Sequence, residues 1–441
     1  MRMFYLIVKY FEFDQDILII VYVTLSYIVY ALSISYLSQV LFRDEKVTII
    51  IILIAMYSPL MGMNMANFSY GFGNYNPTLY YIPSNSLRIL ALALVIQRKW
   101  IYASICLVLS IYSHLLMGFL ITPVILGIII VYRKNLISKQ FIISIAIFVS
   151  LVALYLYLFT FDKNIELISI DMHEWMLTMR AFSHHWFPYQ LGYFGWNSEK
   201  VFVPSLFLLM TFIFFLRWDN RNLNIVDLGI LLGIVFVLLL TISGIFFSIS
   251  EYSVLTTKLA LHRASGVFTL IASIYLIKFL VDRIYKQQII IISLSMWALI
   301  SIFMVKPGFA LLPIMILIVY DLLTEKKSFI SVEKSSYKYL LLIIVFLLLP
   351  LLLLPNDSIL SFLIYGGKEV GISKSLFWIV VFSFSLFLYL VNKNSLFSHK
   401  THNRLLYTSI FLILVVSLKF NYIIQWNDRK GEEIRDYKDV Q

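Results

Sequence analysis

Residues 100–132 read WIYASICLVLSIYSHLLMGFLITPVILGIIIVY and contain no Asp, Glu, Lys or Arg. A transmembrane helix needs about 20 apolar residues to cross the hydrocarbon core of a bilayer. This run of 33 residues is therefore too long for one ordinary span and too short for two full ones. We predict a break near His114, which Gly118 and Pro123 follow, and hence two short helices. Such a break is tolerated at membrane depth only where the backbone faces protein or a water-filled cavity.

Similar apolar runs recur along the whole chain. Of its 441 residues, 61% are hydrophobic and only 13% are charged, whereas a soluble domain has about 25% charged residues. The runs predict an all-α protein, a polytopic transmembrane helical bundle of about 12–14 helices, some of them short or broken, around an outward-facing cavity. The predicted spans are 17–42, 47–64, 79–97, 100–113, 115–132, 141–161, 201–217, 226–250, 264–281, 289–304, 309–323, 338–355, 375–392 and 405–425.

Basic side chains gather in five short connections between these spans. The positive-inside rule places such connections on the cytoplasmic side of the membrane. Alternation along the chain then puts residues 43–46 and 98–99 on the same inner side. The basic residues are Arg133, Lys134 and Lys139; Arg217 and Arg221; Lys278, Arg283 and Lys286; Lys326, Lys327, Lys334 and Lys338; and Lys393, Lys400 and Arg404.

The same alternation assigns the outer side. It predicts a transmembrane domain over residues 1–426 in the cytoplasmic (inner) membrane and an extracytoplasmic tail over 427–441, with both termini of the chain outside. The predicted outer loops are 65–78, 162–200, 251–263 and 356–374.

The net charge of +11 would suggest a nucleic-acid ligand in a soluble protein. Here the inner loops account for the charge, so we expect membrane lipids as partners and no nucleic acid. The single cysteine, Cys106, lies in an apolar run, which excludes a disulfide framework and a cysteine-based metal site.

The longest predicted outer loop contains DMHEWMLTMR at residues 171–180. If this stretch is helical, Asp171 and Glu174 share a face and His173 stands two turns before Arg180. Such a set could supply a general base, or bind Mg²⁺ or Mn²⁺ through Asp171 and His173. The alternative is a solvated amphipathic helix on the membrane, because the spacing matches no specific metal signature.

The loop continues with RAFSHHWFPYQLGYFGW at residues 180–196, which holds two adjacent histidines and seven aromatic rings. Trp and Tyr are enriched at membrane interfaces, so an interfacial anchor would explain most of the rings. Arg180 could bind a phosphate through two hydrogen bonds, and His184 and His185 suit phosphate contact or proton transfer. The aromatic faces, with Trp186 among them, could line a cavity and cover a sugar ring or an isoprenoid tail.

A second basic pair lies in EYSVLTTKLALHRASG at residues 251–266, where His262 and Arg263 stand at the start of a predicted helix. An arginine at the head of an outer-leaflet cavity could hold a pyrophosphate. The alternative is an interfacial anchor that reaches lipid headgroups.

Two more ionisable residues fall among the apolar runs. Arg88 lies inside the span that follows a predicted helix start at Ser84 or Ser86, and it needs a partner or a ligand there. His114 and Gly118 lie four residues apart on one helix face. His114 either lines the cavity or caps the broken helix, and Gly118 then allows close helix packing.

Three stretches in order carry a family resemblance: NPTLYYIPSNSLRILALALVIQRKWIYASICLVLSIYSHLLMGFL at 76–120, MRAFSHHWFPY at 179–189 and LALHRASGVFTLIASIYLIKFL at 259–280. They combine a small-residue helix, a His…Gly helix break, an Arg…His-His loop and a later Arg at a helix start. This order resembles bacterial membrane proteins related to the C-type glycosyltransferase superfamily, including O-antigen and capsule polymerase-like proteins. The likeness covers roughly residues 17–300.

The resemblance implies a polyprenyl-phosphate or polyprenyl-pyrophosphate sugar as the donor, held in an outward-facing cavity. Inverting transfer needs a carboxylate base and cations at the leaving phosphate. Asp171 or Glu174 would be the base, acting with the catalytic His184 and His185. The residues expected at the phosphate are Arg88, Arg180, His262 and Arg263.

One departure from the family pattern concerns the ends of the chain. In the family the acidic base lies in the first outer loop after an initial helix, whereas here the N-terminus is already predicted outside. Only Glu12, Asp14 and Asp16 stand as candidates from that region. We therefore expect a chain shortened at both ends.

Two other functions stay open. A lipid-linked oligosaccharide flippase or transporter would carry ionisable residues near mid-membrane along several helices. The predicted spans are instead nearly free of charge, with Arg88 and Lys278 close to span ends. A non-catalytic membrane subunit is the other alternative, because the first outer loop, which holds the acidic base in the family, is missing from this sequence.

Overall fold

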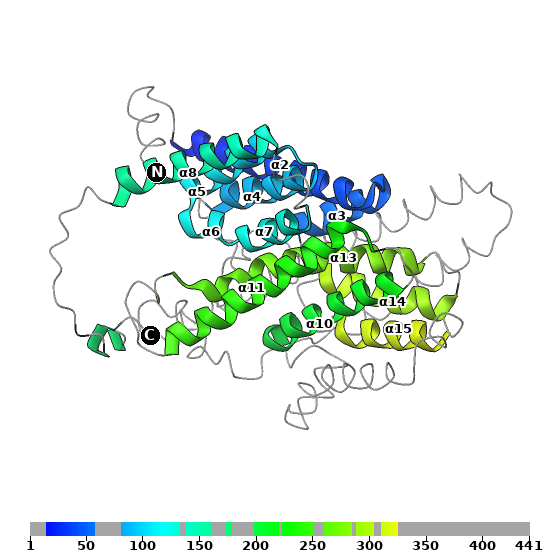
Figure 1. The fold of residues 1–441 in the computed structure, drawn as a ribbon. Coiled ribbons are helices and arrows are strands. Elements are labelled where there is room, and N and C mark those ends of the chain that lie inside the picture. Colours follow the sequence, from blue (N-terminus) through cyan, green and yellow to red (C-terminus); the bar gives the residue numbers. More distant parts are fainter. Residues whose placement is uncertain are drawn as a thin grey trace. The chain divides into compact units, whose positions relative to one another are not determined.

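The computed structural model describes most of the first three quarters of the chain, and every regular element in that part is a helix (Figure 1). Four of these helices are long and apolar enough to cross a membrane: Thr24–Phe42, Lys139–Tyr157, Ile225–Phe247 and Leu261–Ile284. The all-helical class is therefore confirmed, and the helices are those of a membrane protein. The described residues are 15–57, 81–132, 138–160, 171, 173–175, 177–178, 198–219, 223–249, 257, 259–284, 288–303 and 310–324.

The helices follow the apolar runs of the sequence closely. Each of the first eleven predicted spans coincides with a described helix or helix pair, whereas the last three spans lie outside the described residues. The helices are α2 (Gln15–Phe42), α3 (Glu45–Tyr57), α4 (Tyr81–Ile96), α5 (Trp100–Ser113), α6 (Leu115–Phe119), α7 (Thr122–Val131), α8 (Lys139–Thr160), α10 (Ser198–Asp219), α11 (Ile225–Ile249), the short 3₁₀ helix η5 (Leu261–Ala264), α13 (Ser265–Ile284), α14 (Ile289–Phe303) and α15 (Leu311–Thr324).

Two details of α4 differ from the sequence prediction. The helix begins at Tyr81, not at Ser84 or Ser86, with Pro83 in its first turn, where proline leaves no helical hydrogen bond unmade. Arg88 is then the eighth of sixteen residues, so it lies at the middle of the helix and not close to its end.

The predicted break in the run 100–132 is confirmed. Helix α5 ends at Ser113, His114 adopts an extended conformation, and the five-residue α6 follows. Helix α7 starts at Thr122 with Pro123 in its first turn, a position that proline favours. The run therefore forms short helices in place of one long span.

The chain divides into two compact units. The first contains α2 to α8, the C-terminal part of α10, α11, η5 and α13 as far as Ile274. The second contains the N-terminal part of α10, α13 from Tyr275 onward, α14 and α15.

Within the first unit, α4 packs against α2 and α5, α5 packs against α8, and α11 packs against α7 and η5. The α7–α11 contact is a seam of glycines. A Cβ on Gly127 would overlap the backbone of Gly229 and Gly233, and one on Gly233 would lie 2.5 Å from the Cα of Val124. Small residues let helix backbones approach closely, which is how transmembrane helices gain dispersion energy.

One end of the first unit brings several connections together. The phenol of Tyr36 near the end of α2 interacts with Gln97 and accepts a hydrogen bond from Lys99 at 3.1 Å. The Arg98 guanidinium lies 4.5 Å from the ring centroid of Tyr132, which ends α7. The structure thus gathers the end of α2, the connection 98–99 and the end of α7 at one end of the unit, and the charge pattern assigns the connections at these helix ends to the same side.

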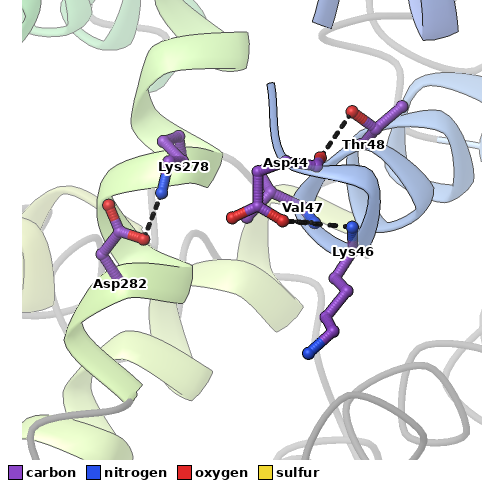
Figure 2. Close-up of polar contacts among 6 residues, drawn as sticks. All are labelled: Asp44, Lys46, Val47, Thr48, Lys278 and Asp282. Carbon is purple, nitrogen blue, oxygen red and sulfur yellow. Dashed lines mark hydrogen bonds and ion pairs between the residues drawn. The ribbon is translucent and has the colours of Figure 1, made fainter. Parts of the chain in front are cut away.

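The start of α3 at this end is capped by Asp44. Its carboxylate accepts hydrogen bonds from the backbone nitrogens of Lys46 and Val47 at 3.1 and 3.2 Å, and Thr48 donates its hydroxyl to the Asp44 carbonyl (Figure 2). An aspartate N-cap of this kind satisfies backbone donors that the first helical turn leaves unpaired.

The second unit is held by charged pairs at helix ends. Arg283 at the end of α13 forms an ion pair with the fully buried Asp321 near the end of α15. Lys278 and Asp282 pair within α13 at 2.5 Å (Figure 2). The contact between Arg283 and Asp321 places the C-terminal ends of α13 and α15 at the same end of this unit, as two intervening reversals of the chain require.

Candidate functional site

Three residues that the sequence marked as site candidates converge inside the first unit. Arg88 comes from α4, His114 from the break between α5 and α6, and Arg263 from η5. The positive charges of Arg263 and Arg88 both interact electrostatically with the imidazole of His114. We call these three residues the cationic cluster. They are up to 175 positions apart (263 − 88), so the fold and not local sequence brings them together.

Arg88 is the deepest member of the cluster. Its side chain is 1% exposed and is among the largest fully buried side chains of the protein. Within the described part of the chain it makes one hydrogen bond, from Nη1 to the Met117 carbonyl at 3.1 Å, and its Nε has no partner. A guanidinium has five N–H donors. The described ion pairs involve Arg217, Lys278 and Arg283 but not Arg88.

His114 has the capping role that the sequence offered as one of its two alternatives. Its Nδ1 accepts a hydrogen bond from the backbone nitrogen of Met117 at 3.2 Å, at the start of α6. Met117 is therefore bound at its nitrogen by His114 and at its oxygen by Arg88. The close packing of Gly118 is also confirmed, because a Cβ there would lie 2.6 Å from the backbone nitrogen of Ile111.

Helix η5 brings Arg263 to the cluster. It begins after Ala260, whose φ of 42° is a left-handed conformation uncommon for a residue other than glycine. A Cβ on Gly244 of α11 would overlap the backbone of Leu261 and His262, so this glycine lets η5 lie directly on α11. His262 and Arg263 are 3% and 5% exposed. Burial this deep in the protein favours an internal role over an anchor that reaches lipid headgroups.

Two further polar residues of α4 were missed by sequence reasoning as site candidates. Asn85 is 2% exposed, and its side-chain oxygen has no hydrogen-bond partner in the described part of the chain. Ser84 donates its hydroxyl to the Ser110 carbonyl at 3.0 Å, and Ser110 donates to the Ser84 carbonyl at 2.7 Å. In the sequence, a run of Ser and Asn is typical of a helix start. Only because α4 begins earlier, at Tyr81, is it evident that these residues lie inside the helix.

The acidic candidates, unlike the two arginines of the cationic cluster, are not buried. Asp171, His173 and Glu174 are exposed, and the Asp171 carboxylate accepts hydrogen bonds from the backbone nitrogens of His173 and Glu174 at 2.8 and 3.3 Å. This is the geometry of a residue that caps a helical turn. Among the residues described, no group of three His, Cys, Asp or Glu side chains could hold a metal ion.

The remaining candidates are Arg180, His184, His185 and Trp186. All four lie outside the described residues. Their predicted roles stay predictions.

An apolar cavity of about 650 Å³ lies in the first unit among α4, α5, α7, α8 and α11. Its volume is within the range of about 300–1,000 Å³ typical of ligand sites. Apolar side chains such as Leu107, Phe148 and Leu240 form most of its wall. Ser243 also lines it, and the next residue, Gly244, packs on the backbone of His262. The cavity therefore reaches the helix turn that contacts η5.

Comparison with known proteins adds no relative, since no family model, curated protein or solved structure matches the chain.

Proposed function

We propose that the protein is a membrane glycosyltransferase or polysaccharide polymerase, which transfers sugar from a polyprenyl-phosphate or polyprenyl-pyrophosphate donor to an acceptor on the outer face of the cytoplasmic membrane. The observation that carries this proposal is Arg88, a fully buried guanidinium with one hydrogen bond and no described carboxylate partner. An intramembrane charge of this kind is costly and by default indicates function.

The chemistry of the cluster favours a phosphate ligand. A guanidinium matches the oxygens of a phosphate through paired hydrogen bonds. Arg263 and His114 add a second cation and an imidazole in electrostatic contact. A pyrophosphate diester carries two negative charges and would balance two arginines, whereas a phosphodiester, like one carboxylate, carries only one.

The position of the cluster favours a ligand attached to a lipid. Helix α5 separates His114 from the Lys99 end of the unit by fourteen residues, or about 20 Å at 1.5 Å per residue. The hydrocarbon core is about 30 Å thick, so a cluster at this distance would lie within it if α5 runs across the membrane, toward the side opposite the basic connections. The apolar cavity that reaches the α11–η5 contact offers a place for the hydrocarbon chain of the same molecule.

In the proposed reaction, an acceptor hydroxyl attacks the anomeric carbon of the donor sugar. The bond between that carbon and the phosphate oxygen breaks, its electron pair stays on the phosphate, and the hydroxyl proton passes to a carboxylate. Fixed cations in a site of low dielectric constant stabilise the charge that develops on the leaving phosphate. Glu174 is the better candidate for the base among the described acids, because the Asp171 carboxylate is engaged in capping.

The experiment compares variants in cells from which the native gene has been deleted. We expect Arg88→Met and Arg263→Ala to abolish the surface glycan and to accumulate its lipid-linked precursor, with normal membrane insertion. Ser38→Ala is the matched control, since Ser38 is a buried α2 residue whose hydroxyl also has no partner in the described part of the chain. Unchanged glycan length and yield in the two arginine variants would overturn the proposal.

The flippase and the non-catalytic subunit predict different outcomes in the same system. In proteoliposomes a flippase would move the lipid-linked sugar across the bilayer without forming a glycan product. A subunit would restore glycan synthesis only together with a separate transferase.

A further inference from the structure

Asn85 is a buried polar side chain that the cationic cluster alone does not explain. It is 2% exposed, and its amide oxygen has no hydrogen-bond partner within the described residues. A buried amide left without hydrogen bonds costs free energy, so it persists only where something offsets that cost.

The helix geometry associates Asn85 with Arg88. The two residues are three positions apart on α4, and side chains at this spacing are neighbours on one helix face. Helical side chains also lean toward the N-terminus, which directs the guanidinium of Arg88 back over the turn that contains Asn85.

The chemistry of the amide differs from that of the cluster. An amide presents an acceptor oxygen as well as N–H donors. Phosphate oxygens are themselves acceptors, so a bare phosphate satisfies Arg88 but leaves the Asn85 oxygen without a donor. A ligand that satisfies both residues carries a hydroxyl group close to its phosphate.

We propose that Asn85 is a specificity-determining residue that accepts a hydrogen bond from a hydroxyl on the group esterified to the phosphate held by Arg88. The site then takes a hydroxylated phosphodiester, such as a sugar joined to a lipid phosphate, in preference to an unsubstituted or alkylated phosphate. This inference rests on the proposed function for the phosphate itself. It adds that the protein recognises a hydroxyl group on the part of the donor joined to that phosphate.

The test uses two probe lipids of equal charge, dodecyl 2,3-dihydroxypropyl phosphate and dodecyl propyl phosphate, which differ only in two hydroxyl groups. Binding to the purified full chain in a maltoside detergent is measured by calorimetry. We expect the wild type to bind the dihydroxypropyl probe more tightly. Asn85→Leu should lower that affinity about threefold to tenfold, as expected for one neutral hydrogen bond, and leave the propyl probe unchanged.

Three variants make the result specific. Asn85→Ala removes the amide without adding bulk, and it tests the proposal if Asn85→Leu does not fold. Arg88→Met should lower the affinity for both probes, because each probe has the phosphate. Ser38→Ala removes an equally buried α2 hydroxyl without a described partner and should change neither.

The outcomes separate this inference from the proposed function. If the folded Asn85 variants change the affinities for both probes equally, or change neither affinity, the proposed role of Asn85 is overturned. The phosphate site would still stand. If Arg88→Met changes neither probe, the phosphate site itself is overturned. If ethyl 2,3-dihydroxypropyl phosphate, which lacks the long chain, binds as tightly as the dodecyl probe, the proposal that the donor is lipid-linked is overturned. Recognition of the hydroxyl group would still stand.

Discussion

Arg88 and Arg283 are both arginines within helices, but their surroundings differ. Arg283 pairs with the fully buried carboxylate of Asp321, whereas Arg88 is 1% exposed and donates one hydrogen bond to the Met117 carbonyl. A paired buried charge supports the fold through its partner, while an unpaired one costs several kcal/mol of desolvation. At the scale of single residues, this contrast separates an arginine that supports the fold from one that we propose binds a ligand.

The first prediction therefore concerns thermal stability in detergent without added lipid phosphate. Arg88→Met should raise the melting temperature, because it removes a desolvation cost of several kcal/mol and loses one hydrogen bond of about 1 kcal/mol. Arg283→Met should lower it, because leaving the Asp321 carboxylate unpaired costs about 3–5 kcal/mol. Both values come from a fluorescence-detected melt, and a destabilised Arg88→Met would show that this arginine supports the fold.

A second prediction at this scale concerns the cap of α6. His114→Ala removes the acceptor for the Met117 backbone nitrogen and should cost about 1 kcal/mol of stability. His114→Asn keeps a side-chain acceptor suited to an N-cap and should recover most of that loss. Equal melting temperatures for the two variants would show that the capping bond is unimportant.

The residues of the site were only partly predictable from sequence. Arg88, His114, His262 and Arg263 stand out because ionisable side chains are rare in apolar runs, and the structure buries both arginines and His262. Asn85 gave no such signal, since an amide beside serines is also typical of a helix start. The convergence of α4, the helix break and η5 depends on contacts distant in sequence, which one sequence does not encode in any local pattern.

At the scale of elements, the glycine seam between α7 and α11 determines how closely two helices of the first unit approach. Gly127 and Gly233 each leave no room for a Cβ against the backbone of the facing helix. The same helix α11 carries Gly244 farther along, where η5 packs on it. The seam therefore positions the element that carries Arg263.

A third prediction follows for this seam. Gly233→Ala should destabilise the protein by about 1–3 kcal/mol, since its Cβ would lie 2.5 Å from the Cα of Val124 and the helices must separate. Ile242→Ala on the same helix is the control, because Ile242 is 61% exposed and its change should leave the melting temperature nearly unaltered. Equal melting temperatures for Gly233→Ala and the wild type would contradict the seam.

The presence of the helices was more predictable than their boundaries. The need for a break followed from length, because 33 apolar residues fit neither one span nor two, and its place near His114 followed from His114, Gly118 and Pro123. The start of α4 was placed at Ser84 or Ser86 and lies at Tyr81. Ser84 and Ser86 are buried within the helix, where Ser84 bonds across to α5, so tertiary contacts outweigh their preference for a cap.

At the scale of the whole molecule, the account depends on which face of the membrane the cluster occupies. The end of α2, the connection 98–99 and the end of α7 meet at one end of the first unit, as the assignment of their connections to the cytoplasm requires. The cluster lies about 20 Å away along α5. An outer site follows if the charge pattern orients the chain by the positive-inside rule.

The fourth prediction tests this orientation in cells. With the single native cysteine removed by Cys106→Ser, Lys46→Cys should react with a membrane-impermeant maleimide only after permeabilisation. Thr178→Cys should react in intact cells, because loop 162–200 is predicted outside. Both positions are exposed. The reverse labelling pattern would place the cluster on the cytoplasmic side and contradict an outer-face reaction.

The central claim, that Arg88 binds a phosphate within the membrane domain, can be tested by solid-state NMR. The protein is labelled with ¹⁵N at arginine, saturated with dodecyl 2,3-dihydroxypropyl phosphate in phosphate-free maltoside, and measured by ³¹P dephasing of the guanidinium signals. The account predicts dephasing in the wild type that is reduced in Arg88→Met and unchanged in Arg283→Met. Absence of dephasing in the saturated wild type, or equal dephasing in Arg88→Met, would contradict it.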